Sequence, residues 1–489
     1  MSQPVSRLIV GPFNRVEGDL EVRLDVEDGT VRSAHVNSTM YRGFEQILQG
    51  KPAFDALVYV PRICGICSVS QSVAAARALG DLMGAHAPPN GQRVINIMQA
   101  TENLADHLSH FYLFFMPDFA RSGYAHQPWH GAVHERFAAQ AGRHARMALA
   151  ARQRWFTLLG TLGGKWPHTQ SIEPGGSSRA LEAGERIRLL ARIREFRAFL
   201  EQTLFAAPLE AVAAIDSEAA LRAWHAQDAP EAGDLRLFLT IAWNNRLEHM
   251  GPGPGLYMSN GAYPAPDGAF LFARGLWQAG KGAAPLDTGA IGEDATHAWL
   301  SDAGGPRHPA QGLTLPQPDK AGAYTWNKAP RLAGKVLETG ALARQLVDGH
   351  PLILDAAGRC GGSVYTRVLA RLLELALVVP AMERWVRELD NGAPYFSHAE
   401  LPPEGEGMGL TEAARGSLGH WVSIRKGRIS NFQIVAPTSW NFSPRDAHGV
   451  PGALEAALVG APVLAGETTP VAVQHIVRSF DPCMVCTVH

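Results

Sequence analysis

The chain has 489 residues, of which 46% are hydrophobic and 18% are charged, and its formal net charge at pH 7 is -2. This composition excludes a disordered chain, and the lack of a basic surplus argues against a nucleic-acid binder. Met1 is not followed by a charged segment and an apolar leader, and no apolar stretch reaches the roughly 18 residues of a membrane span. We therefore expect a cytoplasmic protein without a membrane-spanning helix.

The first predicted element is a β-hairpin at residues 21–36, where apolar and polar side chains alternate around a turn at Asp28-Gly29. Three long helices are then predicted, because apolar residues recur every three to four positions between Gly or Pro residues. They cover residues 92–116, 131–160 and 180–207.

The second half of the chain begins with a Gly/Pro-rich block at 251–330, which we expect to be dominated by loops or short irregular strands. A long helix at 362–389 and a hairpin at 420–435, turning at Lys426-Gly427, complete the prediction. The predicted fold class is α+β and predominantly helical: a core of long helices with a β-hairpin toward each end. The predicted regions are 1–60 (β-rich), 61–215 (helical), 216–335 (Gly/Pro-rich loops) and 336–489 (helical, with C-terminal strands and a metal-ligand tail).

Cysteines carry the clearest chemical pattern. Four of the five form two C-x-x-C pairs, Cys64 with Cys67 and Cys483 with Cys486, and two thiolates at this spacing can grip a transition metal. A zinc module places its pairs about 20 residues apart, and a thioredoxin-like dithiol needs a following helix, for which the second pair leaves no room. We therefore predict that the two ends of the chain meet at one buried centre with four thiolates, with structural zinc as the main alternative. Cys360 has no partner and is predicted to be a small buried residue.

Other groups near these pairs suit a redox or proton-handling site. Glu17, in FNRVEGDLEV, could accept a proton near a metal thiolate, although a surface carboxylate is the commoner case. His489 stands three residues after Cys486 and offers an imidazole or a carboxylate as a ligand. Arg415 is either a fixed cation opposite a buried anionic site or an exposed arginine.

Seven motifs occur in one order along the chain: RVEG, YRGFE, RICGIC, HFY, EAARGSLGHW, PTSWN and DPCMVCTVH. With them the chain resembles the large, catalytic subunit of nickel-iron hydrogenases over essentially its full length. The resemblance implies reversible, heterolytic oxidation of dihydrogen to protons and electrons at a Ni-Fe(CO)(CN)2 centre. In that centre Cys64 and Cys483 bind nickel terminally, while Cys67 and Cys486 bridge nickel to the iron.

The same resemblance assigns roles to further residues. Glu17 is the implied proton acceptor, and Ser439 donates to one cyanide. A canopy over the open metal face is formed by Asp106, Arg415 and Asp481, with Arg415 directed toward the other cyanide. A nearby Mg2+ site, which ties the C-terminus into the core, is implied for Glu45, the main-chain carbonyl of Val435 and His489.

Three positions resemble a regulatory, hydrogen-sensing subgroup. Gln71 stands where histidine is usual, and Ile66 and Phe114 are bulkier than the usual Val and Leu along the gas path. The resemblance therefore implies an oxygen-tolerant hydrogen sensor that regulates hydrogenase expression. Ala414 precedes Arg415 where the family pattern has proline, so we expect a slightly different canopy shape.

The implied partners are a small subunit that carries the iron-sulfur clusters, a histidine kinase if the protein is a sensor, and maturation proteins. The chain itself has no ferredoxin-like run of cysteines. Most relatives are made with an extension beyond the final histidine that a protease removes, so a chain ending at His489 is expected to be the processed form or one made without the extension. Two alternatives stay open: an energy-conserving uptake hydrogenase and a non-catalytic scaffold, which has no reason to keep four cysteines with Glu17 and Arg415.

Overall fold

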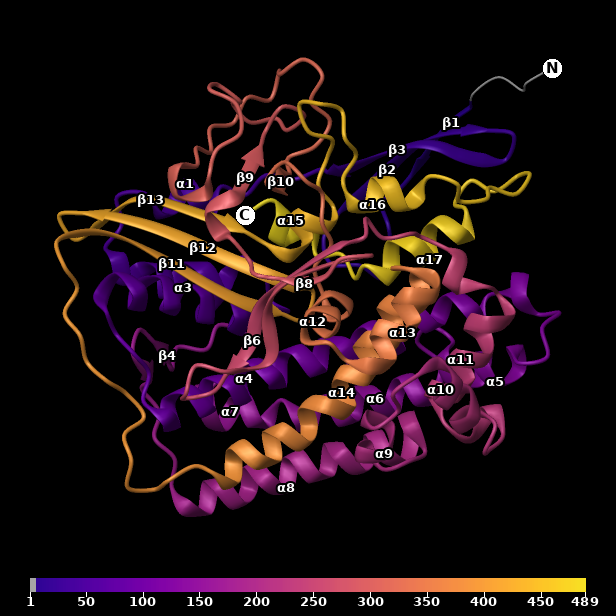
Figure 1. Ribbon diagram of the computed structural model, residues 1–489, viewed down its shortest axis with the longest axis horizontal. Helices are drawn as coiled ribbons and strands as arrows, with labels where there is room; N and C mark the ends of the chain where they lie inside the picture. The colour runs from indigo at the N-terminus through magenta and orange to yellow at the C-terminus, as the bar shows by residue number, and fades with distance from the viewer. Residues whose placement is uncertain (1–5) are drawn as a thin grey trace.

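The computed structural model describes residues 6–489, so the first five residues of the region predicted to be β-rich lie outside it. Helices form the body of the protein, and small antiparallel sheets lie against it (Figure 1). The last residues of the chain are buried beside the N-terminal third, and a parallel bridge joins Glu17 to Cys483. The predicted α+β fold, with distant segments converging on one site, is confirmed.

The α-helices begin and end as follows: α1 Phe44–Leu48, α2 Ala56–Tyr59, α3 Ser68–Met83, α4 Pro89–Ser109, α5 His130–Phe137, α6 Arg143–Trp155, α7 Thr157–Gly163, α8 Ala183–Phe199, α9 Leu209–Ala213, α10 Glu218–His225, α11 Asp234–Asn244, α12 Ala341–Asp348, α13 Pro351–Cys360, α14 Val364–Arg387, α15 Pro437–Asn441, α16 Ala453–Leu458, α17 Val471–Ser479 and α18 Met484–Thr487. The strands are β1 Ser6–Val10, β2 Leu20–Glu27, β3 Thr30–Ser38, β4 Ile172–Glu173, β5 Gly176–Ser177, β6 Leu256–Pro264, β7 Phe270–Gln278, β8 Gly282–Ala284, β9 Ile291–Asp294, β10 Ala329–Leu332, β11 Glu404–Ala413, β12 Gly416–Arg425 and β13 Arg428–Val435.

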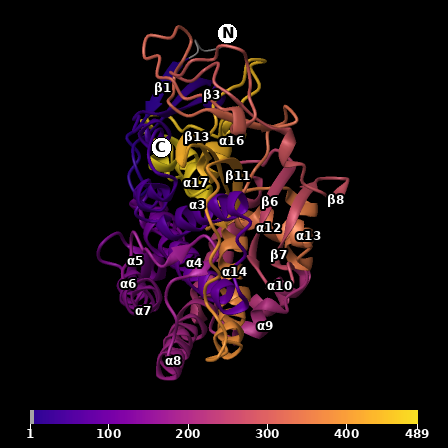
Figure 2. The same cartoon turned by 90° about the vertical axis from the view of Figure 1, so that its left-hand side faces the viewer.

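Three of the four predicted long helices are found. Helix α14 matches its prediction, while α4 and α8 each continue into a π-helical turn, His110–Phe115 and Leu200–Phe205. The segment 131–160 is not one helix but three, α5, α6 and α7. The break before α6 falls at Gly142, where a Cβ atom would collide with the main chain of the preceding helix. Long α4 and α14 pack against each other, and α8 lies along α14 (Figures 1 and 2).

Helix α3 was not among the predicted helices. Most of its residues are buried, but Ser, Gln and Ala make up much of the buried surface, so the helix lacks a strong apolar stripe. The sheet β11-β12-β13 covers it, and Gly409 of β11 is needed there because a Cβ atom would collide with the carbonyl group of Ala74. This close contact holds the middle of α3, the helix that follows Cys67, against the sheet.

Both predicted hairpins are present, and each gains a third strand. Strands β2 and β3 pair with Val22 opposite Val36, and β1 adds to the edge of β2. Strands β12 and β13 turn at the predicted Lys426-Gly427, and β11 pairs along the other edge of β12. Alternate side chains of β2 are buried, as its pattern predicts.

The Gly/Pro-rich block is more regular than predicted in its first half. There β6 and β7 form an antiparallel pair of nine-residue strands, whereas residues 295–328 are mostly loop. Turn residues marked the block correctly but did not reveal the two strands between them. Within residues 6–489, no helix combines the length and apolarity required to cross a bilayer.

Candidate metal centre

The four paired cysteines meet in the interior. The Sγ atoms of Cys64 and Cys483 lie 3.3 Å apart, those of Cys67 and Cys486 3.2 Å apart, and those of Cys483 and Cys486 3.2 Å apart. All four sulfur atoms lie within 4.8 Å of one another, and each residue is at most 7% exposed. Cys360 lies elsewhere and is half-buried rather than buried, with its thiol donating to the carbonyl of Ala356 at 3.2 Å.

Hydrogen bonds fix the main chain beside each cysteine pair. Cys67 immediately precedes α3, and the carboxylate of Glu102, from α4, accepts the N–H groups of Val69 and Ser70 at the start of that helix (2.8 and 2.9 Å). Burial raises the pKa of Glu102 to about 7. At the other end of the chain, the N–H of Cys483 donates to the Thr438 hydroxyl at 3.2 Å.

Close packing of the thiols favours the ionisation of one of them. Hydrogen bonds from Cys483, Cys486 and Cys67 lower the pKa of Cys64 well below its usual range, whereas the pKa of Cys67 is raised by the same neighbours. Thiolate is the form that binds metal, and a metal replaces the protons that the remaining thiols hold. The cluster is therefore a preformed soft-metal site.

Glu17 lies against the second cysteine pair through its main chain. Its N–H donates to Pro482 at 3.4 Å, and its carbonyl accepts the N–H of Met484 at 2.8 Å. Burial raises the pKa of the half-buried Glu17 carboxyl, and the charge of Cys64 raises it further. Proximity to a thiolate and a raised proton affinity are both properties of a proton acceptor at this centre.

Arg415, Asp106 and Asp481 come together as the resemblance implies. One guanidinium nitrogen, Nη2, lies 3.1 Å from Oδ1 of each carboxyl group, and Nε donates to the carbonyl of Asp481 at 2.9 Å. All three residues are 3% exposed. Burial and the charge of Asp481 raise the pKa of Asp106 well above its usual range, while Arg415 lowers the pKa of Asp481 despite burial.

Two buried donors in this region have no protein partner. Nη1 of Arg415 and the hydroxyl of Ser439 are both buried without a hydrogen-bond partner among the described residues. Buried donors are normally satisfied, so these two indicate that an acceptor group belongs beside them. Four cysteine ligands and two unpaired donors fit a nickel-iron group whose iron carries ligands that accept hydrogen bonds. A zinc ion bound by the four cysteines would leave both donors without an acceptor.

Two of the residues predicted to bind Mg2+, Glu45 and His489, lie next to each other. The Glu45 carboxylate accepts the N–H of Ile434 at 2.8 Å and lies 3.2 Å from Nε2 of His489, whose Nδ1 is 2.6 Å from the Cys486 carbonyl. Val435, whose carbonyl was predicted as a ligand, is the buried residue after Ile434. Burial alone would raise the pKa of Glu45, but Lys328 and His489 lower it to about 2.

Lys328 is a member of this cluster that the sequence did not reveal. Its Nζ lies 3.3 Å from carboxylate oxygens of both Glu45 and Glu293 and 2.8 Å from Oε1 of Gln433. No sequence motif surrounds Lys328, Glu293 or Glu102. A single charged residue outside a motif gives no indication in the sequence that it will be buried. Only their burial in the fold distinguishes them.

The three residues linked to the sensing subgroup have separate surroundings. Gln71 is buried in α3, with Oε1 2.8 Å from Nε2 of His420. Ile66 packs against the cysteine cluster, and its N–H donates to Cys64 Sγ at 3.3 Å. Phe114 is half-buried in the π-helical turn after α4, and its carbonyl accepts from Arg15 at 3.0 Å.

These features define a class of protein: a metalloprotein with a four-cysteine site for a transition metal in its interior and a buried cluster of one guanidinium and two carboxyl groups. The family model described as nickel-dependent hydrogenase matches residues 42–127 and 122–489. The chain belongs to this family and is the catalytic large subunit of a nickel-iron hydrogenase, an oxidoreductase that acts on hydrogen.

Relatives match the chain along nearly its whole length. The periplasmic [NiFeSe] hydrogenase large subunit of Desulfomicrobium baculatum is 30% identical, with 99% of this chain and 95% of the relative covered. The Hydrogenase-2 large chain of Escherichia coli K12 is 28% identical, at 99% and 97% coverage. Among solved structures, the reduced Ni-Fe-Se hydrogenase of D. vulgaris Hildenborough superimposes with a TM-score of 0.84 at 30% identity, covering 99% of this chain and 100% of that one. This chain has cysteine at all four positions of the cluster.

Proposed function

We propose that this subunit holds a Ni-Fe(CO)(CN)2 centre and serves as an oxygen-tolerant hydrogen sensor that regulates hydrogenase expression. It works with a small subunit that carries the iron-sulfur clusters, and it signals through a histidine kinase. Maturation proteins install the metals. Reduced thiols suit a cytoplasmic location, and none of the five cysteines forms a disulfide within residues 6–489.

Four thiolates hold the metal group. Cys64 and Cys483 would hold nickel, and Cys67 and Cys486 would hold both metals, with the sulfur atoms of each of these two sets already in contact across the two chain segments. When bound, the group supplies the site at which dihydrogen is split. The free Nη1 of Arg415 and the hydroxyl of Ser439 donate to the cyanides, while Asp106 and Asp481 fix the guanidinium in place.

Glu17 moves the proton. Its carboxylate accepts a proton from the thiolate side of the centre, and its raised pKa lets it hold that proton before release. Glu45, the carbonyl of Val435 and His489 bind Mg2+ beyond the cysteines. The lowered pKa of Glu45 keeps its carboxylate charged, as a hard cation requires.

The observation that carries the sensor role is the position of Ile66 against the cysteine cluster. Side chains in a close-packed wall transmit added volume as a narrower aperture, so Ile66 and Phe114 restrict oxygen more than the smaller hydrogen. A sensor tolerates the slower turnover that follows. An uptake hydrogenase is the second candidate, since the chain is 26% identical to the uptake hydrogenase large subunit of Cupriavidus necator H16.

The double variant Ile66→Val with Phe114→Leu tests this role. We expect hydrogen oxidation to stay intact without oxygen and to decay in air, where the parent persists. The matched control is Ile187→Val with Phe396→Leu, the same chemical changes at exposed positions. If the Ile66/Phe114 variant keeps its activity in air as long as the parent does, these side chains do not restrict the access of oxygen. That result would favour the uptake hydrogenase as the function of this subunit.

A further inference from the structure

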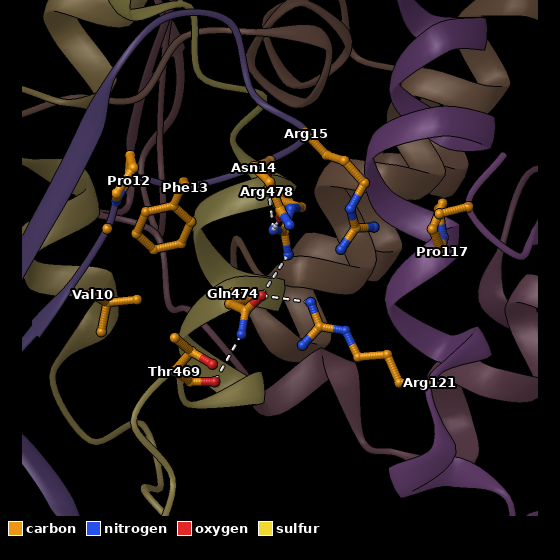
Figure 3. Close-up of a pocket in the computed structure, with 12 residues that line it drawn as sticks. Val10, Pro12, Phe13, Asn14, Arg15, Pro117, Arg121, Thr469, Gln474 and Arg478 are labelled. Carbon is orange, nitrogen blue, oxygen red and sulfur yellow. Dashed lines mark hydrogen bonds between the residues drawn. The ribbon is translucent and has the colours of Figure 1, made fainter.

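A polar cavity that none of the cysteines lines lies elsewhere in the molecule. It encloses about 480 Å3 between the segment after β1, the turn after α4 and helix α17. Three arginines line it, Arg15, Arg121 and Arg478, together with Gln474 and the ring of Phe13 (Figure 3). We call this cavity the arginine pocket.

One carboxylate serves all three guanidinium groups. Asp118, which is fully buried, lies 2.5 Å from Arg15, 2.7 Å from Arg121 and 2.6 Å from Arg478. Within residues 6–489, no carboxylate other than that of Asp118 lies within 4 Å of these three arginines. Three positive charges against one negative charge leave the pocket with an excess of two.

Arg478 has hydrogen-bonding capacity left over. It is 1% exposed and donates to Asp118, to Gln474 and to Asn14, yet its Nε has no partner. Burial lowers the pKa of this guanidinium to about 10, although the charge of Asp118 opposes that shift. Buried donors are normally satisfied, so an unpaired donor on a residue that lines a cavity is consistent with an acceptor bound there.

The two outer arginines are reachable from solvent. The side chains of Arg15 and Arg121 are 18% and 32% exposed, and Gln474 Oε1 accepts from Arg121 at 2.6 Å, which orients that guanidinium along the wall (Figure 3). Guanidinium forks match the paired oxygens of carboxylates and phosphates. The cavity volume lies in the range of small-molecule sites.

We infer that the arginine pocket binds an oxyanion, a phosphate or a carboxylate, at a site separate from the metal centre. The oxyanion is either free in solution or presented by an acidic side chain of the partner subunit. Its oxygens meet Arg121 and Arg15 at the mouth, and Arg478, which shares Asp118 with these two arginines, lies at the base.

The test uses the complete two-subunit enzyme and Arg121→Gln, which removes one cation at the mouth and leaves the metal centre untouched. The matched control is Arg143→Gln, which removes an exposed cation that pairs with Glu135 and does not line the pocket. Inorganic phosphate is titrated by calorimetry at low ionic strength, and the dissociation constant of the two subunits is measured in parallel. Unchanged hydrogen oxidation in both variants shows that they fold.

Two results support the inference and distinguish the sources. If the anion is free, the parent binds phosphate, and Arg121→Gln weakens binding about tenfold, the loss of one charge-assisted hydrogen bond. If the partner supplies a carboxylate, the parent binds no phosphate, and Arg121→Gln weakens subunit association by a similar factor while Arg143→Gln does not. The inference is overturned if Arg121→Gln binds phosphate as tightly as the parent, or if neither phosphate binding nor association depends on Arg121.

Discussion

Replacing Glu17 by glutamine tests the proposed proton route. The amide is nearly isosteric with the carboxyl group but cannot accept a proton. The main-chain bonds that hold this residue, to Pro482 and Met484, do not involve its side chain. We therefore expect the variant to fold and to keep its metals.

The expected loss follows from the surroundings of the carboxyl group. Burial and the nearby Cys64 raise the pKa of Glu17, which brings its proton affinity closer to that of the groups it serves. Positioned general bases contribute about 100- to 10,000-fold to a rate, so hydrogen-deuterium exchange should fall by that factor. The exchange is measured by mass spectrometry of the gas phase above the enzyme.

The control for this variant is Glu21→Gln, which removes a carboxylate from β2 that pairs with Arg23 near the surface. It should exchange at the parental rate. Metal content and the infrared bands of carbon monoxide and cyanide should be the same in both variants. If Glu17→Gln retains most of the parental exchange, the base lies elsewhere, and a cysteine sulfur becomes the first candidate.

Further outcomes are expected at the three charged or metal sites. Elemental analysis should find nickel and iron at about one atom each per chain with little zinc; stoichiometric zinc without nickel would refute the proposed centre. Asp118→Asn leaves three guanidiniums without their carboxylate and should cost about 3–5 kcal/mol of unfolding free energy. Burial alone would raise the pKa of Asp118, but His475, Arg478 and Arg15 hold it well below its usual range. The ionised Asp118 therefore contributes fully to the free energy of unfolding above about pH 4, and this contribution is lost as the pH falls further. The free energy of unfolding of Asp118→Asn should lack this part of the decrease at acid pH. Lys328→Met should lower the melting temperature. If Mg2+ binds Glu45, added Mg2+ should raise the melting temperature of this variant more than that of the parent, and equal increases would contradict the Mg2+ proposal.

Motifs located the centre, but the fold supplies its surroundings. The two C-x-x-C pairs could be joined from the sequence because their spacing is rare and needs a metal to explain it. Lys328 and Glu102 could not be found, because each reaches the site across the fold from a segment with no pattern. Helix α3 was also missed, because polar and small residues such as Ser70, Gln71 and Ser72 take up much of its buried surface and weaken its apolar pattern.

The division of residues 131–160 into three helices has a different cause. Their apolar spacing continues through the breaks, so periodicity alone predicts one helix. The break before α6 falls at Gly142, which lies against the main chain of Arg136 in the preceding helix, and apolar periodicity does not register such a backbone contact. Local spacing thus predicted helix content well and helix ends poorly.

Because the metal ligands come from Cys64 and Cys67 on one side and from Cys483 and Cys486 on the other, the bound metals act as a cross-link between distant parts of the chain. The loop they close has about 400 residues, and the chain-entropy relation used for disulfides gives about 6 kcal/mol for such a closure. An enzyme that loses its metals also loses this restraint on its unfolded state. The segment around α18 is then held by its core packing and by hydrogen bonds to residues such as Glu17, Arg42 and Thr438. Metal-free chains should therefore be cut by proteases near residue 483 earlier than chains that hold the metals.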